Sequence, residues 1–169
     1  MSDRRGGLFS FPNPVNDVAA RAVATGVVVL CACSIVFSLP WLVVPLVYGF
    51  WARVLTGPTL SPLGQLATRV VAPRLSTTPR LLAGPPKRFA QGIGAVMSTG
   101  ALVVWLSVGW GVAAWIVGAL MLAASLEASL GLCLGCKIFS LLIRVGVVPE
   151  GICEECGDLG RRHPELARR

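Results

Sequence analysis

The sequence predicts an all-α membrane protein: a four-helix transmembrane bundle made of two hairpins, with short interfacial amphipathic helices and both termini in the cytoplasm. Composition gives the first observation behind this prediction. The 169-residue chain is 54% hydrophobic and 14% charged, with a mean hydropathy of +0.74. Soluble domains are about 45–50% apolar and about 25% charged. A disordered chain is therefore excluded, and an ordinary cytosolic enzyme is disfavoured.

The second observation is that the apolar residues fall into four stretches, residues 22–39, 41–55, 89–108 and 110–132. A helix needs about 17–25 residues to cross the hydrocarbon layer, and the first, third and fourth stretches supply them. The second stretch is short and contains Pro45, with Arg53 near its end. We expect it to cross while Arg53 reaches the headgroups, and a re-entrant segment is the alternative.

The third observation is the distribution of the 15 Lys and Arg residues. Three precede the first stretch, six run from Arg53, near the end of the second, to Arg88, just before the third, and six follow the fourth. The turns near Pro40 and Gly109 carry no charge. By the positive-inside rule, both termini and the long middle loop are cytoplasmic. We therefore expect a cytoplasmic segment 1–21, a transmembrane hairpin 22–55, a cytoplasmic loop 56–88, a second hairpin 89–132 and a cytoplasmic region 133–169. The net charge of +7 reports orientation in this topology, and no motif indicates nucleic-acid binding.

Two short amphipathic helices are expected outside the spans. Ser61 and Pro62 read as an N-cap and first helical position, and the run to residue 72 places Leu63, Leu66 and Val70 on one face. We expect it to lie on the cytoplasmic surface. The second helix follows Cys136 and would return the end of the chain toward the bundle.

Six cysteines are the residues most suggestive of chemistry. Cys31 and Cys33 lie inside the first stretch on opposite helix faces, and we interpret them as packing residues. The other four form a C-x2-C-x16-C-x2-C pattern, Cys133, Cys136, Cys153 and Cys156. This spacing is typical of a four-thiolate zinc site, and thiols stay reduced in the cytoplasm. Our first hypothesis is therefore a membrane subunit or scaffold with a structural zinc ion.

The alternative is redox chemistry, because a C-x-x-C pair can close a transient disulfide. Glu154 and Glu155 should raise the thiol pKa of the second pair, while Lys137 should favour thiolate at the first. Under this hypothesis Cys133 and Cys136 are catalytic. The two hypotheses differ on whether the protein is an enzyme; if it is one, we expect a thiol–disulfide oxidoreductase.

Glu127 is the one carboxylate near an apolar stretch, and an intramembrane acid is a functional candidate. We expect it to pair with Arg53 or Arg88; a proton relay or a substrate contact is the alternative.

Four sequence blocks carry a family resemblance: residues 11–21 (FPNPVNDVAAR), 49–75, 84–96 (GPPKRFAQGIGAV) and 126–139 (LEASLGLCLGCKIF). They resemble an actinobacterial membrane family described as domain of unknown function 4395. The resemblance implies a small multi-pass protein of the plasma membrane with paired cysteines after its last span. It also implies a thioredoxin-like or sulfur-handling protein, or a larger membrane complex, as partner. Membrane lipid is the other expected contact.

Overall fold

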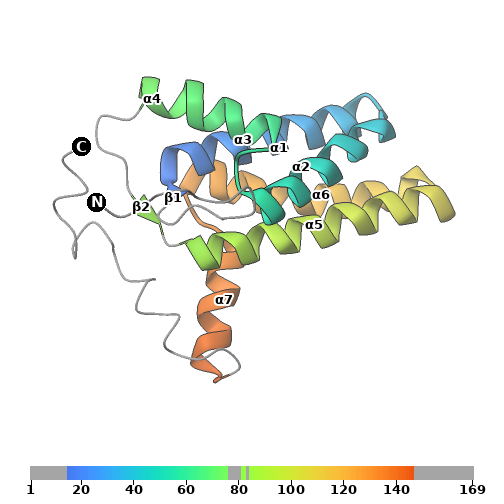
Figure 1. Ribbon diagram of the computed structural model, residues 1–169. Coiled ribbons are helices and arrows are strands. Elements are labelled where there is room, and N and C mark those ends of the chain that lie inside the picture. Colours follow the sequence, from blue (N-terminus) through green and yellow to red (C-terminus); the bar gives the residue numbers. More distant parts are fainter. Residues whose placement is uncertain (1–14, 76–80, 83, 147–169) are drawn as a thin grey trace.

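The computed structural model describes residues 15–75, 81–82 and 84–146 (Figure 1). Within these ranges the chain is helical apart from a two-residue strand pair. The elements in order are β1 (Val15–Asn16), α1 (Asp17–Val36), a 3-10 turn η1 (Pro40–Leu42), α2 (Val43–Thr56), α3 (Pro62–Leu66), a π-helical segment η2 (Ala67–Val71), α4 (Ala72–Leu75), β2 (Leu81–Leu82), α5 (Gly84–Ser107), α6 (Trp110–Leu130) and α7 (Leu134–Arg144).

Helices α1, α5 and α6 are long and apolar enough to cross a membrane, with 20, 24 and 21 residues. At 1.5 Å per residue they measure about 30–36 Å, which matches the hydrocarbon layer. They correspond to the first, third and fourth apolar stretches, and each begins at or before the expected residue. The fold class of a helical membrane protein is thus confirmed.

The second apolar stretch forms a shorter helix. Helix α2 has 14 residues, or about 21 Å, and it ends at Gly57, whose positive φ of 63° turns the chain out of the helix. Helical structure resumes at Pro62, where the Ser61 hydroxyl accepts a hydrogen bond from the Gly64 amide at 3.2 Å. The helical run α3–η2–α4 continues from there to Leu75.

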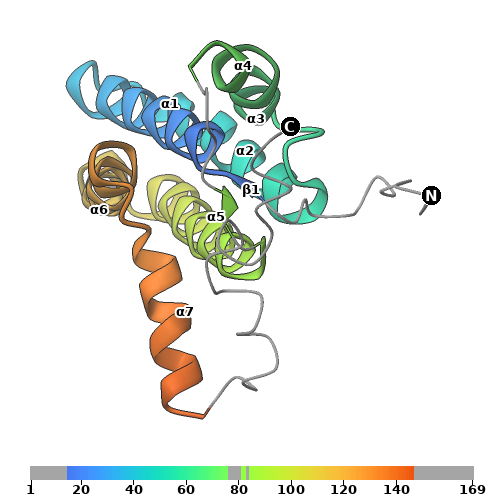
Figure 2. The ribbon, with the colours of Figure 1, turned by 90° about the vertical axis from the view of Figure 1, so that its left-hand side faces the viewer.

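This second helical run lies along α1, parallel to the bundle axis, as the two ribbon views show (Figures 1 and 2). Small side chains allow the close approach: Ala19 of α1 is buried together with Ala67 and Ala72. Gly26 of α1 lies against Leu63, whose Cδ2 would be 2.7 Å from a Cβ atom at residue 26. The predicted amphipathic helix therefore exists, and it packs on α1 instead of crossing the end of the bundle.

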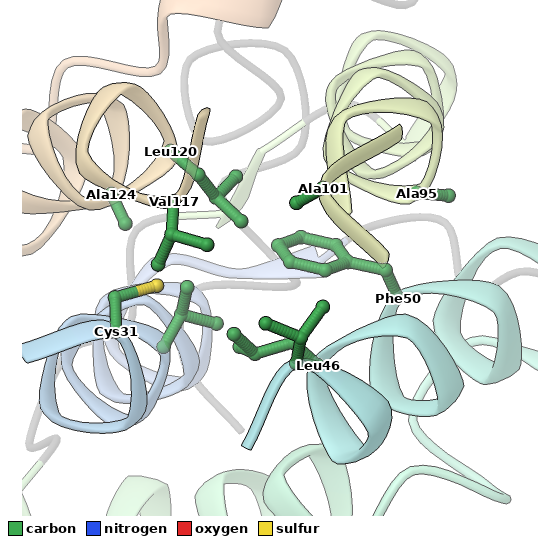
Figure 3. Close-up of a cluster of buried hydrophobic side chains, with 10 residues drawn as sticks. Cys31, Leu46, Phe50, Ala95, Ala101, Val117, Leu120 and Ala124 are labelled. Atoms are coloured by element: carbon green, nitrogen blue, oxygen red, sulfur yellow. The ribbon is translucent and has the colours of Figure 1, made fainter. Parts of the chain in front are cut away.

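The long helices enclose one apolar core (Figure 3). Helix α1 packs against α6, α6 against α5, and α5 against α2. Cys31, Leu46, Phe50 and Val117 are buried between them, so Cys31 is the packing residue that its position predicted. Gly94 of α5 makes room for the Phe50 ring, because a Cβ atom there would lie 2.2 Å from the ring.

Charged side chains that contact neighbouring helices gather at one end of the bundle, which we call the charged end: Arg21, Arg53, Lys87, Arg88 and Glu127. Arg21 donates to the carbonyl oxygens of Ala128 and Ser129, at 3.1 and 2.8 Å, in the last turn of α6. Arg88 likewise donates to the Val54 carbonyl at 3.0 Å, near the end of α2. A cation at a helix C-terminus satisfies orphan carbonyls and opposes the helix dipole.

Candidate functional site

The C-x-x-C pair lies where α6 ends and α7 begins. Gly131, with φ 67°, closes α6 in the left-handed conformation that glycine adopts without strain. Leu132 then donates its amide proton to the Leu126 carbonyl at 3.2 Å, and Cys133 is the N-cap of α7. Cys136 falls in the first turn of α7. The two thiols are therefore held at a helix N-terminus, where the dipole favours a thiolate.

Helix α7 runs across the charged end, roughly perpendicular to the bundle axis (Figures 1 and 2). It docks on α5 through Gly135, where a Cβ atom would come within 2.5 Å of Ala90. The rings of Phe139 and Phe89 also meet there at 5.4 Å. Other apolar side chains of α7 and its C-cap are exposed: Leu134, Ile138, Leu141 and Val145. This arrangement suits an interfacial helix.

The two thiols are electrostatically unequal. Both are unbridged and half-buried. The thiol of Cys136 donates a hydrogen bond to the sulfur of Cys133, and this bond is the main reason why the pKa of Cys133 falls from 9.0 to about 7. Lys87 lowers the Cys133 pKa further, while burial and Glu127 raise it. The same hydrogen bond raises the pKa of Cys136. Of the two thiols, Cys133 therefore has the lower pKa and Cys136 the higher.

Beneath the thiols lies a buried ion pair between Lys87 of α5 and Glu127 of α6. The Lys87 side chain is 5% exposed and that of Glu127 is 16% exposed. Glu127 is thus paired, as predicted, but its partner is Lys87 and not Arg53 or Arg88. Lys87 is also the cation that acts on Cys133, the role that the sequence had suggested for Lys137.

A cavity of about 210 Å³ connects this polar group to the core. Cys133 and Glu127 line it together with Gln91 and Phe50; the other lining side chains are apolar and belong to α1, α5, α6 and α7. The cavity gives a small apolar group or an extended peptide side chain a place to sit beside the Cys133 sulfur.

The structure describes half of the predicted tetracysteine site. Cys153 and Cys156, with Glu154 and Glu155, lie outside the described residues. Within the described ranges no group of three or more His, Cys, Asp or Glu side chains gathers as a metal site would. The four-thiolate zinc site therefore stays a prediction.

Sequence reasoning missed Lys87 and Gln91 as site residues. In the sequence, Lys87 served only as one of the basic residues that predict the orientation of the chain in the membrane, because it precedes the third apolar stretch. A signal existed: helix α5 begins at Gly84, so Lys87 is already helical and sits at the level of Glu127. Gln91, one turn further, is the polar side chain that follows it on the same face.

The chain forms a bundle of apolar helices, and a C-x-x-C pair lies at the N-terminus of a helix that crosses its charged end. These features are those of a small helical membrane protein with a pair of thiols at one end. Residues 15–144 match the profile of a family described as Domain of unknown function (DUF4395). The match spans most of the chain, and the protein belongs to this family. No curated protein and no solved structure matches the chain.

Proposed function

We propose that the protein is a multi-pass thiol–disulfide oxidoreductase of the plasma membrane, with Cys133 as the attacking thiol and Cys136 as the resolving thiol. One observation carries the proposal: Cys133 occupies the N-cap position of α7 beside Cys136, and a side-chain hydrogen bond with Cys136 is the largest cause that lowers the Cys133 pKa to about 7. A thiol with a pKa near ambient pH combines a large thiolate fraction with good nucleophilicity.

The reaction is an exchange of two electrons with a disulfide of a partner protein. The Cys133 thiolate attacks one sulfur of that disulfide, forms a mixed disulfide and expels the other sulfur as a thiolate. This leaving thiolate takes the proton of Cys136. The Cys136 thiolate then attacks the Cys133 sulfur, closes the Cys133–Cys136 disulfide and expels the second partner sulfur, which is protonated by water. The partner is reduced to a dithiol and the protein is oxidised to a disulfide.

The charge distribution supports a cytoplasmic site. The charged end collects basic residues that the positive-inside rule assigns to the cytoplasm, and α7 with its thiols lies at this end. A thioredoxin-like protein is a suitable partner, because its disulfide is accessible to an attacking thiol and is reduced by exchange. The ion pair of Lys87 and Glu127 supports the site from below: the lysine stabilises the thiolate, and the carboxylate keeps the buried lysine compensated.

The test is a redox titration of the full-length protein, purified in detergent, in glutathione buffers of graded potential. We expect a reversible Cys133–Cys136 disulfide, read by peptide mass spectrometry after alkylation. Cys133→Ser should abolish it, and Cys33→Ser, at the matched cysteine inside the bundle, should leave it unchanged. Metal analysis runs in parallel. About one zinc ion per chain that is lost in Cys133→Ser, with no reversible disulfide, would replace this proposal by the structural zinc site and scaffold role that the sequence first predicted.

A further inference from the structure

A second cavity, of about 240 Å³, lies at the break between α2 and α3. Gly57 and Pro58 of the break line it, with Val15, Asn16 and Ala19 at the start of α1 on the other side. Irregular backbone at membrane depth is tolerated where it is buried in protein or lines a polar cavity. In membrane proteins with interrupted helices, such breaks lie at binding sites.

Arg53 is the most unusual side chain of this cavity. It is only 5% exposed, and its contacts are to neutral groups. Its Nε donates to the Gln91 Oε1 at 2.8 Å, and its Nη1 donates to the Ser61 hydroxyl at 3.1 Å. The guanidinium also lies over the Phe50 ring, 4.6 Å from the ring centre. These contacts fix the orientation of the charge without neutralising it.

Lys87 lines the same cavity and is 4% exposed. Lys87 forms an ion pair with Glu127, and this is the one salt bridge found among the described residues. Within the described ranges the carboxylates are Glu127 and Asp17, and the cavity lining includes neither. Glu127 pairs with Lys87 and also acts by its charge on Arg53, so among the described residues two buried cations share one carboxylate, and Arg53 has no ion-pair partner of its own. Burial of an unpaired charge is costly, so a site built in this way is expected to hold an anion.

The neutral lining fits an oxyanion. Gln91 and Asn16 add side-chain amide groups to the wall, and an arginine fork is the side chain that best matches a phosphate-type group. The volume accommodates a tetrahedral ion with some water. Gln91 also lines the cavity below Cys133, so the two cavities adjoin.

We propose that Arg53 and Lys87 form an oxyanion site for a phosphate- or sulfate-type group, either as a free ion or as the headgroup of a phospholipid. The proposal does not rest on the thiol chemistry, because neither Cys133 nor Cys136 lines this cavity. It would also account for the break between α2 and α3 beside a buried arginine.

The test uses the full-length protein in a neutral detergent, with chloride adjusted to constant ionic strength so that screening does not vary. Inorganic phosphate, sulfate and micelle-dispersed phosphatidylglycerol are titrated separately, and thermal unfolding is followed by circular dichroism. Arg53→Gln removes the buried charge. Arg69→Gln is the matched control, because Arg69 is exposed on η2 and does not line the cavity.

We expect stabilisation of the wild-type protein and of Arg69→Gln. In Arg53→Gln the apparent Kd should rise about tenfold or more, as for loss of a charged hydrogen bond. Saturation by the inorganic ions assigns a free-ion site, whereas saturation by phosphatidylglycerol alone assigns a headgroup site. Equal stabilisation in Arg53→Gln, or none in the wild type, overturns the proposal.

If Arg53→Gln does not fold, equilibrium dialysis of radiolabelled sulfate and phosphate against the wild type and Arg53→Lys decides. Binding in the millimolar range or tighter supports the site, and its absence, with no phosphatidylglycerol stabilisation, refutes it.

Discussion

The two ends of the bundle are built on different principles. At the charged end, arginines bind helix carbonyls, a lysine and a glutamate pair in the interior, and two cysteines lie at the N-terminus of a helix. At the opposite end the described turns, residues 37–42 and 107–109, carry no charged residue. There the Ser34 hydroxyl donates to the Leu39 carbonyl at 2.9 Å, and the rings of Trp41 and Trp105 meet edge to face at 5.0 Å.

The difference between the two ends matches a division of roles, with helix packing at the opposite end and the proposed thiol chemistry at the charged end. The opposite end closes its turns with backbone bonds and aromatic rings, which is sufficient for a helix connection at a membrane surface. The charged end instead buries Lys87, Arg53 and Glu127, although a charge removed from water is destabilising unless it is compensated. The predictions below test whether the two ends are independent.

The largest effect is expected from breaking the buried ion pair. Lys87→Met leaves Glu127 without its partner, and we expect the free energy of unfolding to fall by about 3 kcal/mol or more. Lys137→Met, on the exposed side of α7, is the matched control and should change it by less than about 0.5 kcal/mol. Denaturant unfolding in detergent, followed by circular dichroism, gives both values.

The double variant Lys87→Met/Glu127→Leu sharpens this result. Because it removes both charges, it should regain most of the stability that Lys87→Met loses. Equal stabilities for Lys87→Met and Lys137→Met would show that the ion pair does not stabilise the charged end.

The sequence predicted the parts of the fold that depend on local pattern. The three long helices follow from apolar runs of sufficient length, and the helix start at Pro62 follows from the Ser61 cap. Cys31 was recognised as a packing residue from its position within an apolar helix. Each of these features is decided by residues within a few turns of one another.

The remaining features depend on which helices become neighbours. Lys87 and Glu127 are 40 residues apart, and only the packing of α5 against α6 makes them partners. The small residues of α6 illustrate the same limit. A small residue in a membrane helix is typical of a close helix contact, yet a Cβ atom at Gly118 would meet nothing within 4 Å, and the buried face of α6 instead contains Ala113, Val117, Leu120 and Ala124. Periodicity shows which residues share one face of a helix, but it does not show which neighbouring helix that face contacts.

The second prediction concerns the pH dependence of Cys133. With a pKa of about 7, the thiolate fraction and the alkylation rate by iodoacetamide should fall about tenfold from pH 8 to pH 6. Cys136→Ala removes the donor that contributes most to the lowered pKa, so the midpoint should move toward the ordinary value of 9.0. Peptide mass spectrometry assigns the label to Cys133. A midpoint unchanged in Cys136→Ala would contradict the proposed roles of the two thiols.

The smallest effect is expected at the opposite end. Trp41→Leu removes the edge-to-face contact with Trp105 and should lower the free energy of unfolding by about 1 kcal/mol. Trp115→Leu, at a tryptophan that is 82% exposed, should stay within about 0.5 kcal/mol. The decisive readout is functional: in Trp41→Leu the Cys133 alkylation midpoint should remain at about pH 7, because no lowering contribution to that pKa comes from the opposite end. A shifted midpoint would mean that packing at one end sets the geometry of the thiols at the other, and the division between the two ends would fail.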